Sequence, residues 1–282
     1  NFLRRSRYTS VFLVLLAAFC VITVLNINTG NVDISIPKIL KIIFLREGNK
    51  MEYNIIWKIR LPRILMAAIL GGALSLSGFL LQTFFENPIA GPFVLGISSG
   101  AKMVVALAMI YFLGRFQVVS SYTLIIAAFI GSLIATGFIL LVSRRINHMA
   151  TLLVAGIMIG YITSSAISLL NFFATAEGVH SYMIWGMGNF GGVSLQQLPY
   201  FSIFCLAGLL LSILLIKPLN ALLLGTRYAE NLGVNIRRTR NLLLIATGLL
   251  TAVTTAFCGP VAFIGLAVPH ILSLIHISEP TR

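Results

Sequence analysis

Long apolar segments separated by short polar connections follow one another along the 282-residue chain. An α-helix needs about 20 residues to cross a hydrocarbon layer of about 30 Å, and the segments reach this length. A transmembrane β-barrel would instead show alternating residues in segments of about 10, and this alternation is not seen. The pattern predicts an all-α, polytopic transmembrane helical bundle with spans at about residues 8–27, 60–85, 94–113, 121–143, 150–173, 196–217, 240–258 and 261–275.

The connection between the first two spans has a pattern of its own. From Pro37 to Arg46 it places Ile39, Ile42 and Ile43 on one face of a helix. A short amphipathic helix at the membrane surface has this pattern. A plain loop is the other interpretation.

Composition and charge agree with a chain surrounded by membrane lipid. Hydrophobic residues make up 58% of the chain and charged residues 10%, whereas soluble domains have about 25% charged residues. The net charge of +13 comes from basic residues in the connections, so we expect no nucleic-acid binding. The positive-inside rule places residues 1–7, 144–145 and 217–240 in the cytoplasm, although the 28–59 connection on the outer side is also basic.

Small residues recur along two of the predicted spans. Gly156, Gly160, Ser164 and Ser168 follow one another every four residues and therefore share one face of a helix. A second row, at Ala67, Gly71 and Ser75, is similar. Such a face permits close packing of helix backbones, or it lines a pathway for a wide solute.

The chain offers no catalytic set. Its four histidines and three cysteines are far apart, and it contains neither a metal-ligand spacing nor a GxxxxGK[ST] phosphate loop. We therefore expect a protein that is not an enzyme and that binds no metal or cofactor itself. If ATP drives its activity, another subunit must hold the ATP and its Mg.

An ATP-independent secondary transporter or channel is the competing function class. A carrier of this kind commonly has acidic side chains inside its helices and two inverted halves. The predicted spans are almost free of charge, and no inverted halves are evident in the sequence. The pattern argues against a carrier driven by protons or ions.

Six blocks of sequence stand out in order along the chain: Arg60-Leu61-Pro62-Arg63, Glu86–Ala90 with Gly96–Ala101, His148–Thr151 before Leu152–Gly156, Trp185–Gly188, Leu224–Val234 and Gly259–His270. Together they resemble the permease subunit of the ATP-binding-cassette (ABC) importers that carry iron-siderophore complexes, haem and vitamin B12. The resemblance extends from about Ile55 to about Leu272.

The resemblance implies a ten-helix permease of the bacterial inner membrane, of which about eight helices are present. It implies a second permease subunit, either an identical copy or a related half, and an ATPase subunit bound to each permease in the cytoplasm. An extracytoplasmic solute-binding protein would deliver the cargo. An iron-siderophore complex is the expected cargo, ahead of haem and cobalamin.

The resemblance also implies roles for particular residues. Arg60 and Arg63 would dock the binding protein, because guanidinium groups pair with carboxylates in a two-pronged geometry. A cytoplasmic gate would consist of Asn87, Pro88 and Ile89 with Met149, Ala150 and Thr151. The row of Gly156, Gly160, Ser164 and Ser168 would line the translocation pathway. Coupling to the ATPase would use Gly225, Arg227, Ala229, Glu230, Leu232 and Gly233.

After Leu272 the sequence departs from the family pattern, which continues with an arginine, a polar run and two further helices. Residues 273–282 end in a polar stretch that contains Pro280. We expect residues 1–272 to form a permease domain that lacks its last helices, and residues 273–282 to be a non-native tail.

Overall fold

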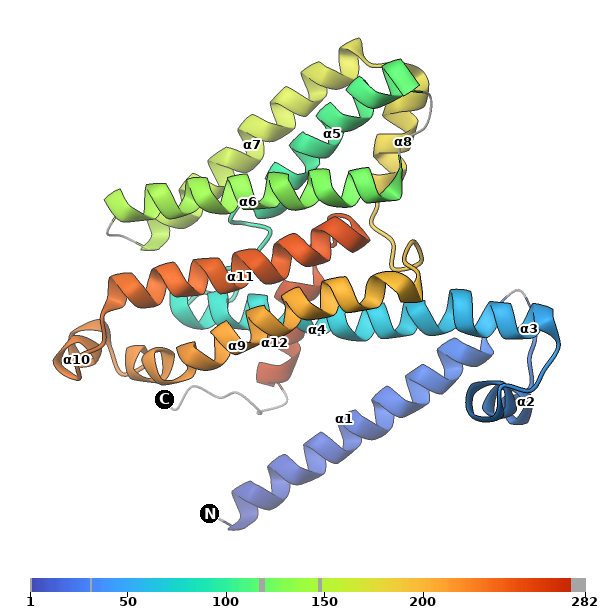
Figure 1. Ribbon diagram of the computed structural model, residues 1–282. Coiled ribbons are helices and arrows are strands. Elements are labelled where there is room, and N and C mark those ends of the chain that lie inside the picture. The colour runs from blue at the N-terminus through green and yellow to red at the C-terminus, as the bar shows by residue number, and fades with distance from the viewer. Residues whose placement is uncertain (1, 31, 117–119, 147–148, 275–282) are drawn as a thin grey trace.

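The protein is an all-helical bundle, and the computed structural model describes residues 2–30, 32–116, 120–146 and 149–274. Every secondary-structure element in these ranges is a helix, which confirms the predicted fold class. In chain order the elements are α1 (Phe2–Asn28), α2 (Ile36–Leu40), η1 (Lys41–Leu45), α3 (Lys50–Asn54), η2 (Ile55–Arg60), α4 (Leu61–Phe85), α5 (Ile97–Phe116), α6 (Ser121–Arg145), α7 (Met149–Phe173), α8 (Ala176–Gly186), η3 (Leu195–Gln197), α9 (Leu198–Leu222), α10 (Thr226–Asn231), α11 (Ile236–Cys258) and α12 (Ile264–Leu274) (Figure 1).

Six helical segments in the described ranges are long and apolar enough to cross a membrane. They agree with six of the predicted spans, and α5 agrees with a seventh, although its apolar part, Ile97–Ile110, is shorter. The helix expected at 60–85 begins earlier, because α3, η2 and α4 form one continuous helix from Lys50 to Phe85. The π-helical η2 ends at Arg60, two residues before Pro62, which has no N–H to donate.

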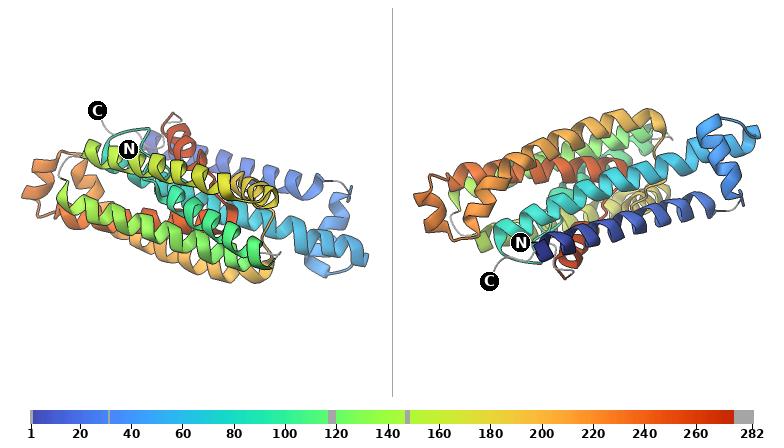
Figure 2. Two further views of the ribbon diagram at one scale, coloured as in Figure 1. Left: turned by 90° about the horizontal axis from the view of Figure 1, so that it is seen from above. Right: turned by 90° about the horizontal axis from the view of Figure 1, so that it is seen from below.

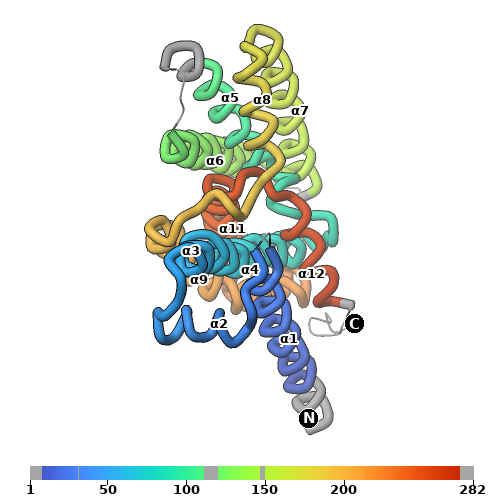
Figure 3. The backbone as a smooth tube through the Cα atoms, turned by 90° about the vertical axis from the view of Figure 1, so that its right-hand side faces the viewer, coloured from blue at the N-terminus to red at the C-terminus, as the bar shows by residue number. Residues whose placement is uncertain are grey.

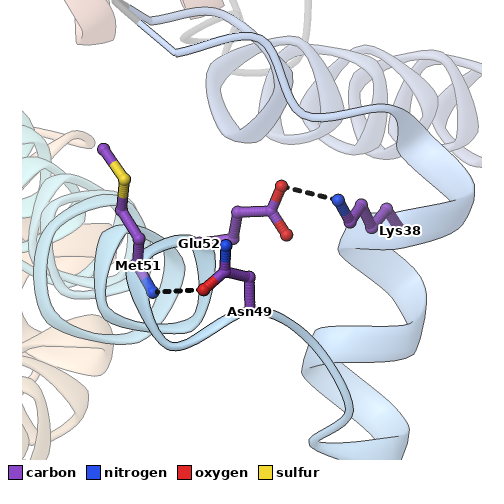
Figure 4. A network of polar contacts seen from close by, with 4 residues as sticks. All are labelled: Lys38, Asn49, Met51 and Glu52. Atoms are coloured by element: carbon purple, nitrogen blue, oxygen red, sulfur yellow. Dashed lines mark hydrogen bonds and ion pairs between the residues drawn. The ribbon is translucent and has the colours of Figure 1, made fainter.

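The connection between α1 and α4 is helical, so the helix interpretation of residues 37–46 is correct. Its α2 and η1 pack Ile39 and Ile42 against Ile56 of η2 in a small separate cluster. An ion pair between Lys38 Nζ and Glu52 Oε1, 2.6 Å apart, joins α2 to α3 (Figure 4). The Oδ1 of Asn49 caps α3 by accepting a hydrogen bond from the Met51 N–H at 3.4 Å. This segment is a folded platform rather than a loop.

Helix α11 is the centre of the bundle and lies between α6 on one side and α4 and α9 on the other (Figure 3). Polar hydroxyl groups line its buried faces. The Thr251 Oγ1 lies 3.1 Å from the Ser77 Oγ of α4, and the Thr255 Oγ1 lies 3.2 Å from the Ser98 Oγ of α5. Such hydrogen bonds between helices add directional contacts where apolar packing alone gives little specificity.

Two pairs of glycines set the closest approaches between helices. A Cβ atom on Gly78 of α4 would overlap the backbone of Gly265 in α12. A Cβ atom on Gly100 of α5 would likewise overlap Gly131 of α6, and the reverse is also true. Small residues let transmembrane backbones touch, and here they fix α12 on α4 and α6 on α5.

Two features differ from the sequence prediction. The 11-residue α8 was not expected, although Thr175 caps it by accepting a hydrogen bond from the Gly178 N–H at 3.2 Å. The helix expected at 261–275 begins at Ile264, because Gly259 has a φ of 76° and the chain is non-helical through Phe263. Most of the tail predicted at 273–282 lies outside the described residues, and that prediction stays open.

Candidate functional site

The long helices run roughly along one axis, so their connections gather at two ends (Figures 1 and 2). We call one the α2 end; it comprises residues 29–63 and 174–197. The other, the α10 end, comprises residues 86–92, 143–151 and 217–240. The positive-inside prediction places the α10 end in the cytoplasm.

At the α2 end, Arg60 is largely buried, with 8% of its surface exposed. Its guanidinium donates hydrogen bonds to the carbonyl oxygens of Ile27 at 2.5 Å, Asn28 at 3.2 Å and Val32 at 2.5 Å. Two of these acceptors belong to the last residues of α1, where backbone carbonyls have no partner inside the helix. Arg60 therefore connects α1 to α4, a role that the sequence analysis missed, and its docking role stays a prediction.

Arg63 lies one turn farther along and is exposed. Its guanidinium borders the turn at Gly191, because a Cβ atom there would come within 2.5 Å of Arg63 Nη2. The turn is held by Asn189, whose Oδ1 accepts a hydrogen bond from the Gly191 N–H at 2.7 Å. The Asn189 N–H donates in turn to the carbonyl oxygen of Cys258 at 2.7 Å. Arg63 therefore rests on a turn that is fixed to α11.

The first predicted gate segment is a tight turn at the end of α4. Glu86 ends the helix with a φ of 48°. The Asn87 Oδ1 accepts a hydrogen bond from the Ile89 N–H at 3.0 Å. The backbone carbonyl oxygen of Asn87 accepts one from the Ala90 N–H at 3.0 Å. Ile89 is 66% exposed, so the turn presents an apolar side chain next to a proline.

The second predicted gate segment forms the first residues of α7. Ala150 and Thr151 are exposed, and the side chain of Met149 lies outside the described part of the structure. Leu152, which follows directly, is buried in the same hydrophobic cluster as Ala90. The structure thus brings the two predicted gate segments to one region of the α10 end.

The row of small residues on α7 divides into two halves. Gly156 is buried, and a Cβ atom there would lie 2.7 Å from the Cα of Leu95, so this position serves helix packing. A Cβ atom on Gly160 would lie 3.6 Å from the Ser99 Oγ, an ordinary contact. Ser164 and Ser168 are exposed, and the Ser168 Oγ donates to the Ser164 carbonyl oxygen at 3.0 Å. Only the second half of the row faces outward.

The predicted coupling segment forms the short helix α10 and its two flanking turns. Gly225 and Gly233 have φ angles of 105° and 83°, which a side chain would strain. Ala229 is fully buried against the bundle, whereas Arg227, Glu230 and Leu232 are exposed. All six predicted residues therefore belong to one elbow with a buried anchor and a charged outer face.

Arg240, near the start of α11, is a second largely buried arginine, with 8% of its surface exposed. It donates hydrogen bonds to the carbonyl oxygens of Ile146, at 2.8 Å, and Ser143. The sequence analysis included it only in the basic connection 217–240. It lies one turn after the partly buried Ile236 and one turn before the buried Leu244, so it shares the inward face of α11.

Comparison with known proteins identifies the family. The model of the FecCD transport family matches residues 15–281. The chain belongs to the FecCD transport family. This confirms the resemblance that the six sequence blocks indicated.

Its relatives are permeases of the same kind. The vitamin B12 import system permease protein BtuC of Klebsiella pneumoniae subsp. pneumoniae is 41% identical over 224 residues, which are 79% of this chain and 66% of BtuC. BtuC of Salmonella typhi is 39% identical over the same share of this chain and over 68% of its own length. The chain thus spans about two thirds of the length of these relatives.

A solved structure is also similar to this FecCD member over most of its length. It is described as an inward-facing conformation of a metal-chelate type ABC transporter, with a TM-score of 0.82 and 26% identity, covering 96% of this chain and 83% of that one. The family and the long apolar helices make the chain a multi-pass protein of the bacterial inner membrane.

Proposed function

We propose that this chain is the permease subunit of an ABC importer that moves metal chelates, iron-siderophore complexes first among them, into the cytoplasm. Membership of the FecCD family and similarity to a metal-chelate type ABC transporter support the proposal. The observation that supports it most is the α10 elbow. A permease that has no phosphate loop of its own needs a surface that an ATPase can bind and move.

The elbow suits this role chemically. Its anchor, Ala229, is buried in the core cluster, so a force on the outer face acts on the bundle and not on a loose loop. Arg227 and Glu230 offer charges of both signs for pairing with a partner, and Leu232 is 60% exposed beside them. ATP and Mg belong to the ATPase subunit, and the permease contributes only the contact.

The other end of the bundle would receive the cargo. Arg63 is exposed at the α2 end, where a carboxylate of a solute-binding protein could pair with its guanidinium. The exposed Ser164 and Ser168 would face the pathway against a second permease subunit, because most of α7 is not covered by its own chain. Glycine and serine walls accommodate bulk and leave the choice of chelate to the binding protein.

Cobalamin is the second candidate cargo. The observation that favours it is the 39–41% identity to permeases named for vitamin B12 import. Both cargoes are wide metal chelates, and the permease surfaces described above do not separate them. An uptake assay with both substrates is the direct comparison.

The test reconstitutes the full-length permease with its ATPase and binding protein in proteoliposomes. Uptake of a ferric hydroxamate siderophore, cyanocobalamin and haem is measured with ATP and with a non-hydrolysable analogue. We expect ATP-dependent uptake of one of them, and loss of ATPase copurification in Arg227→Ala/Glu230→Ala but not in Arg144→Ala, an exposed arginine outside the elbow. Undiminished uptake without any ATPase would instead establish an ATP-independent carrier.

A further inference from the structure

Arg240 joins two elements of the α10 end that are far apart in the sequence. It sits on the first turns of α11, and both of its acceptors, the carbonyl oxygens of Ser143 and Ile146, lie at the end of α6. A neighbouring contact supports the junction, since the Ser143 Oγ lies 3.5 Å from the Asn241 Oδ1. The start of α11 and the end of α6 are therefore joined by polar contacts, two of which come from one guanidinium.

The chemistry of this junction favours arginine over other side chains. The last carbonyl groups of a helix lack partners within the helix and form the negative end of its dipole, so a cation is stabilised there. In the described part of the chain no carboxylate pairs with Arg240, and the carbonyls take that place. A planar guanidinium reaches two carbonyls at once with fixed geometry, whereas a lysine ammonium is a single point charge.

The elements on either side of this contact have separate predicted roles. On the α11 side, the elbow lies just before Arg240 in the chain. The elbow ends at Asn235, which caps α11: its Oδ1 accepts a hydrogen bond from the Arg238 N–H at 3.0 Å. On the α6 side, the chain continues to α7, which begins at Met149. Arg240 is thus a side chain through which the chain that follows the elbow contacts α6, next to α7.

The elbow also borders α9. A pocket of about 500 Å³ lies between the end of α9, the turn at Gly233 and the start of α11, with Pro218 and Leu242 among its lining residues. The pocket does not separate the elbow from α9, because Ala229 is buried in one cluster with Leu219 and Leu222 of α9. The elbow therefore contacts α9 by apolar packing, and the chain that follows it reaches α6 through the polar contact of Arg240.

We propose that Arg240 is a positioning residue that transmits movement of the α10 elbow to the end of α6 and, through it, to α7. The inference rests on the proposed function, because it assumes that an ATPase moves the elbow. A residue between two sites is not by itself a coupling element, so the test must measure coupling and not only activity.

The test uses the reconstituted transporter with Arg240→Gln and Arg240→Lys in the permease. The matched control is Arg144→Gln, because Arg144 is an exposed arginine at the same end of α6. Three quantities are measured for each complex: its melting temperature, its ATP hydrolysis rate, and the cargo imported per ATP hydrolysed, using whichever probe the wild type takes up.

We expect Arg240→Gln to assemble with the ATPase and to hydrolyse ATP, but to import about fivefold less cargo per ATP, the lower range of ordinary coupling effects. Arg240→Lys should fall between Arg240→Gln and the wild type, and Arg144→Gln should match the wild type. The proposal is wrong if Arg240→Gln imports as much cargo per ATP as the wild type. It is also wrong if the loss of import is no larger than the loss of folded complex, because Arg240 is then a structural residue. Should Arg240→Gln fail to assemble, Arg240→Lys decides by the same criterion. A wild type without ATP-dependent uptake would overturn the proposed function instead.

Discussion

The two ends of the bundle use the same chemistry for different purposes. At the α2 end Arg60 donates to carbonyl oxygens at the end of α1, and at the α10 end Arg240 donates to carbonyl oxygens at the end of α6. Both arginines are 8% exposed, and both place a cation at the negative end of a helix dipole. The two contacts differ in what else holds the helix.

Helix α1 has little other support apart from Ile27, which packs against the platform cluster at the end of the helix. None of its side chains that the structure describes is buried, and it diverges from α4 along its length (Figure 1). Helix α6 is packed on α5 through Gly131, and on α11 through Thr136, which a Cβ atom on Gly248 would overlap. Arg60 therefore supplies most of the contacts that hold the end of α1, whereas Arg240 adds a polar contact to helices that already pack.

This difference separates structural from transmitting roles. A hydrogen bond that alone fixes an element contributes to its position, and its loss releases that element. The same bond between packed elements changes how they move together more than whether they pack. The hydrogen bonds alone do not distinguish a structural from a transmitting role. The packing around the bonded helices distinguishes them.

The strongest test of the comparison is Arg60→Met. The variant leaves three carbonyl groups without their donor at a largely buried site, so we expect the free energy of unfolding to fall by about 3 kcal/mol. Trp57 reports on this site because its Nε1 donates to the Ile42 carbonyl oxygen at 3.3 Å in the adjoining platform. Denaturation followed by tryptophan fluorescence measures the effect, with the exposed Arg63→Met as control. Equal stability of the two variants would show that α1 is held by something else.

Arg240→Met should destabilise less, by about 2 kcal/mol, because only two carbonyls lose their donor and α6 keeps its packing. The two sites lie at opposite ends of the bundle and share no partner, so the Arg60→Met/Arg240→Met double variant should be additive within about 0.5 kcal/mol. The same denaturation assay provides the comparison. A larger deviation from additivity would mean that the two ends are coupled through the long helices.

The sequence predicted the helices well, because apolar length is a local property. The six residues that the family resemblance implied for coupling also lie together in one elbow, in which Gly225 and Gly233 flank a short charged segment and adopt positive φ angles. The sequence prediction missed α8, whose 11 residues are too short for a span, although Thr175 followed by Glu177 was a recognisable cap. Element boundaries failed where a π-helical turn continued the helix before Pro62.

The roles of individual side chains were harder to predict. Arg60 and Arg63 look alike in the sequence, three residues apart in one block, yet one is buried and the other exposed. Their difference depends on where α1 ends, which is a long-range contact that no local pattern contains. Gly156 and Ser168 also differ in burial although they share one predicted row. Helix α7 packs against residues 94–95 at Gly156, and this contact buries Gly156 but not Ser168.

Docking should separate the two arginines of the same block. Arg63→Glu should weaken binding of the solute-binding protein about tenfold at 0.1 M salt, because an exposed charge pair adds modest affinity and orientation. The effect should shrink at 1 M salt, where the Debye length is about 3 Å. The control is Arg145→Glu, an exposed arginine at the opposite end. Binding measured across salt concentrations tests this, and an affinity that ignores both salt and the Arg63 charge would contradict a docking role.

The smallest expected effect comes from two adjacent glycines, of which only the first lies beside Arg63. A Cβ atom on Gly191 would lie 2.5 Å from Arg63 Nη2, whereas one on Gly192 would meet nothing within 4 Å. Because the end of an arginine side chain moves easily, Gly191→Ala should shift the guanidinium without unfolding the turn, and docking should weaken by about twofold, a fraction of one hydrogen bond. Gly192→Ala should leave docking unchanged. If the two variants bind the solute-binding protein equally well while Arg63→Glu does not, the guanidinium acts as a diffuse charge, and its resting place on the turn is irrelevant to docking.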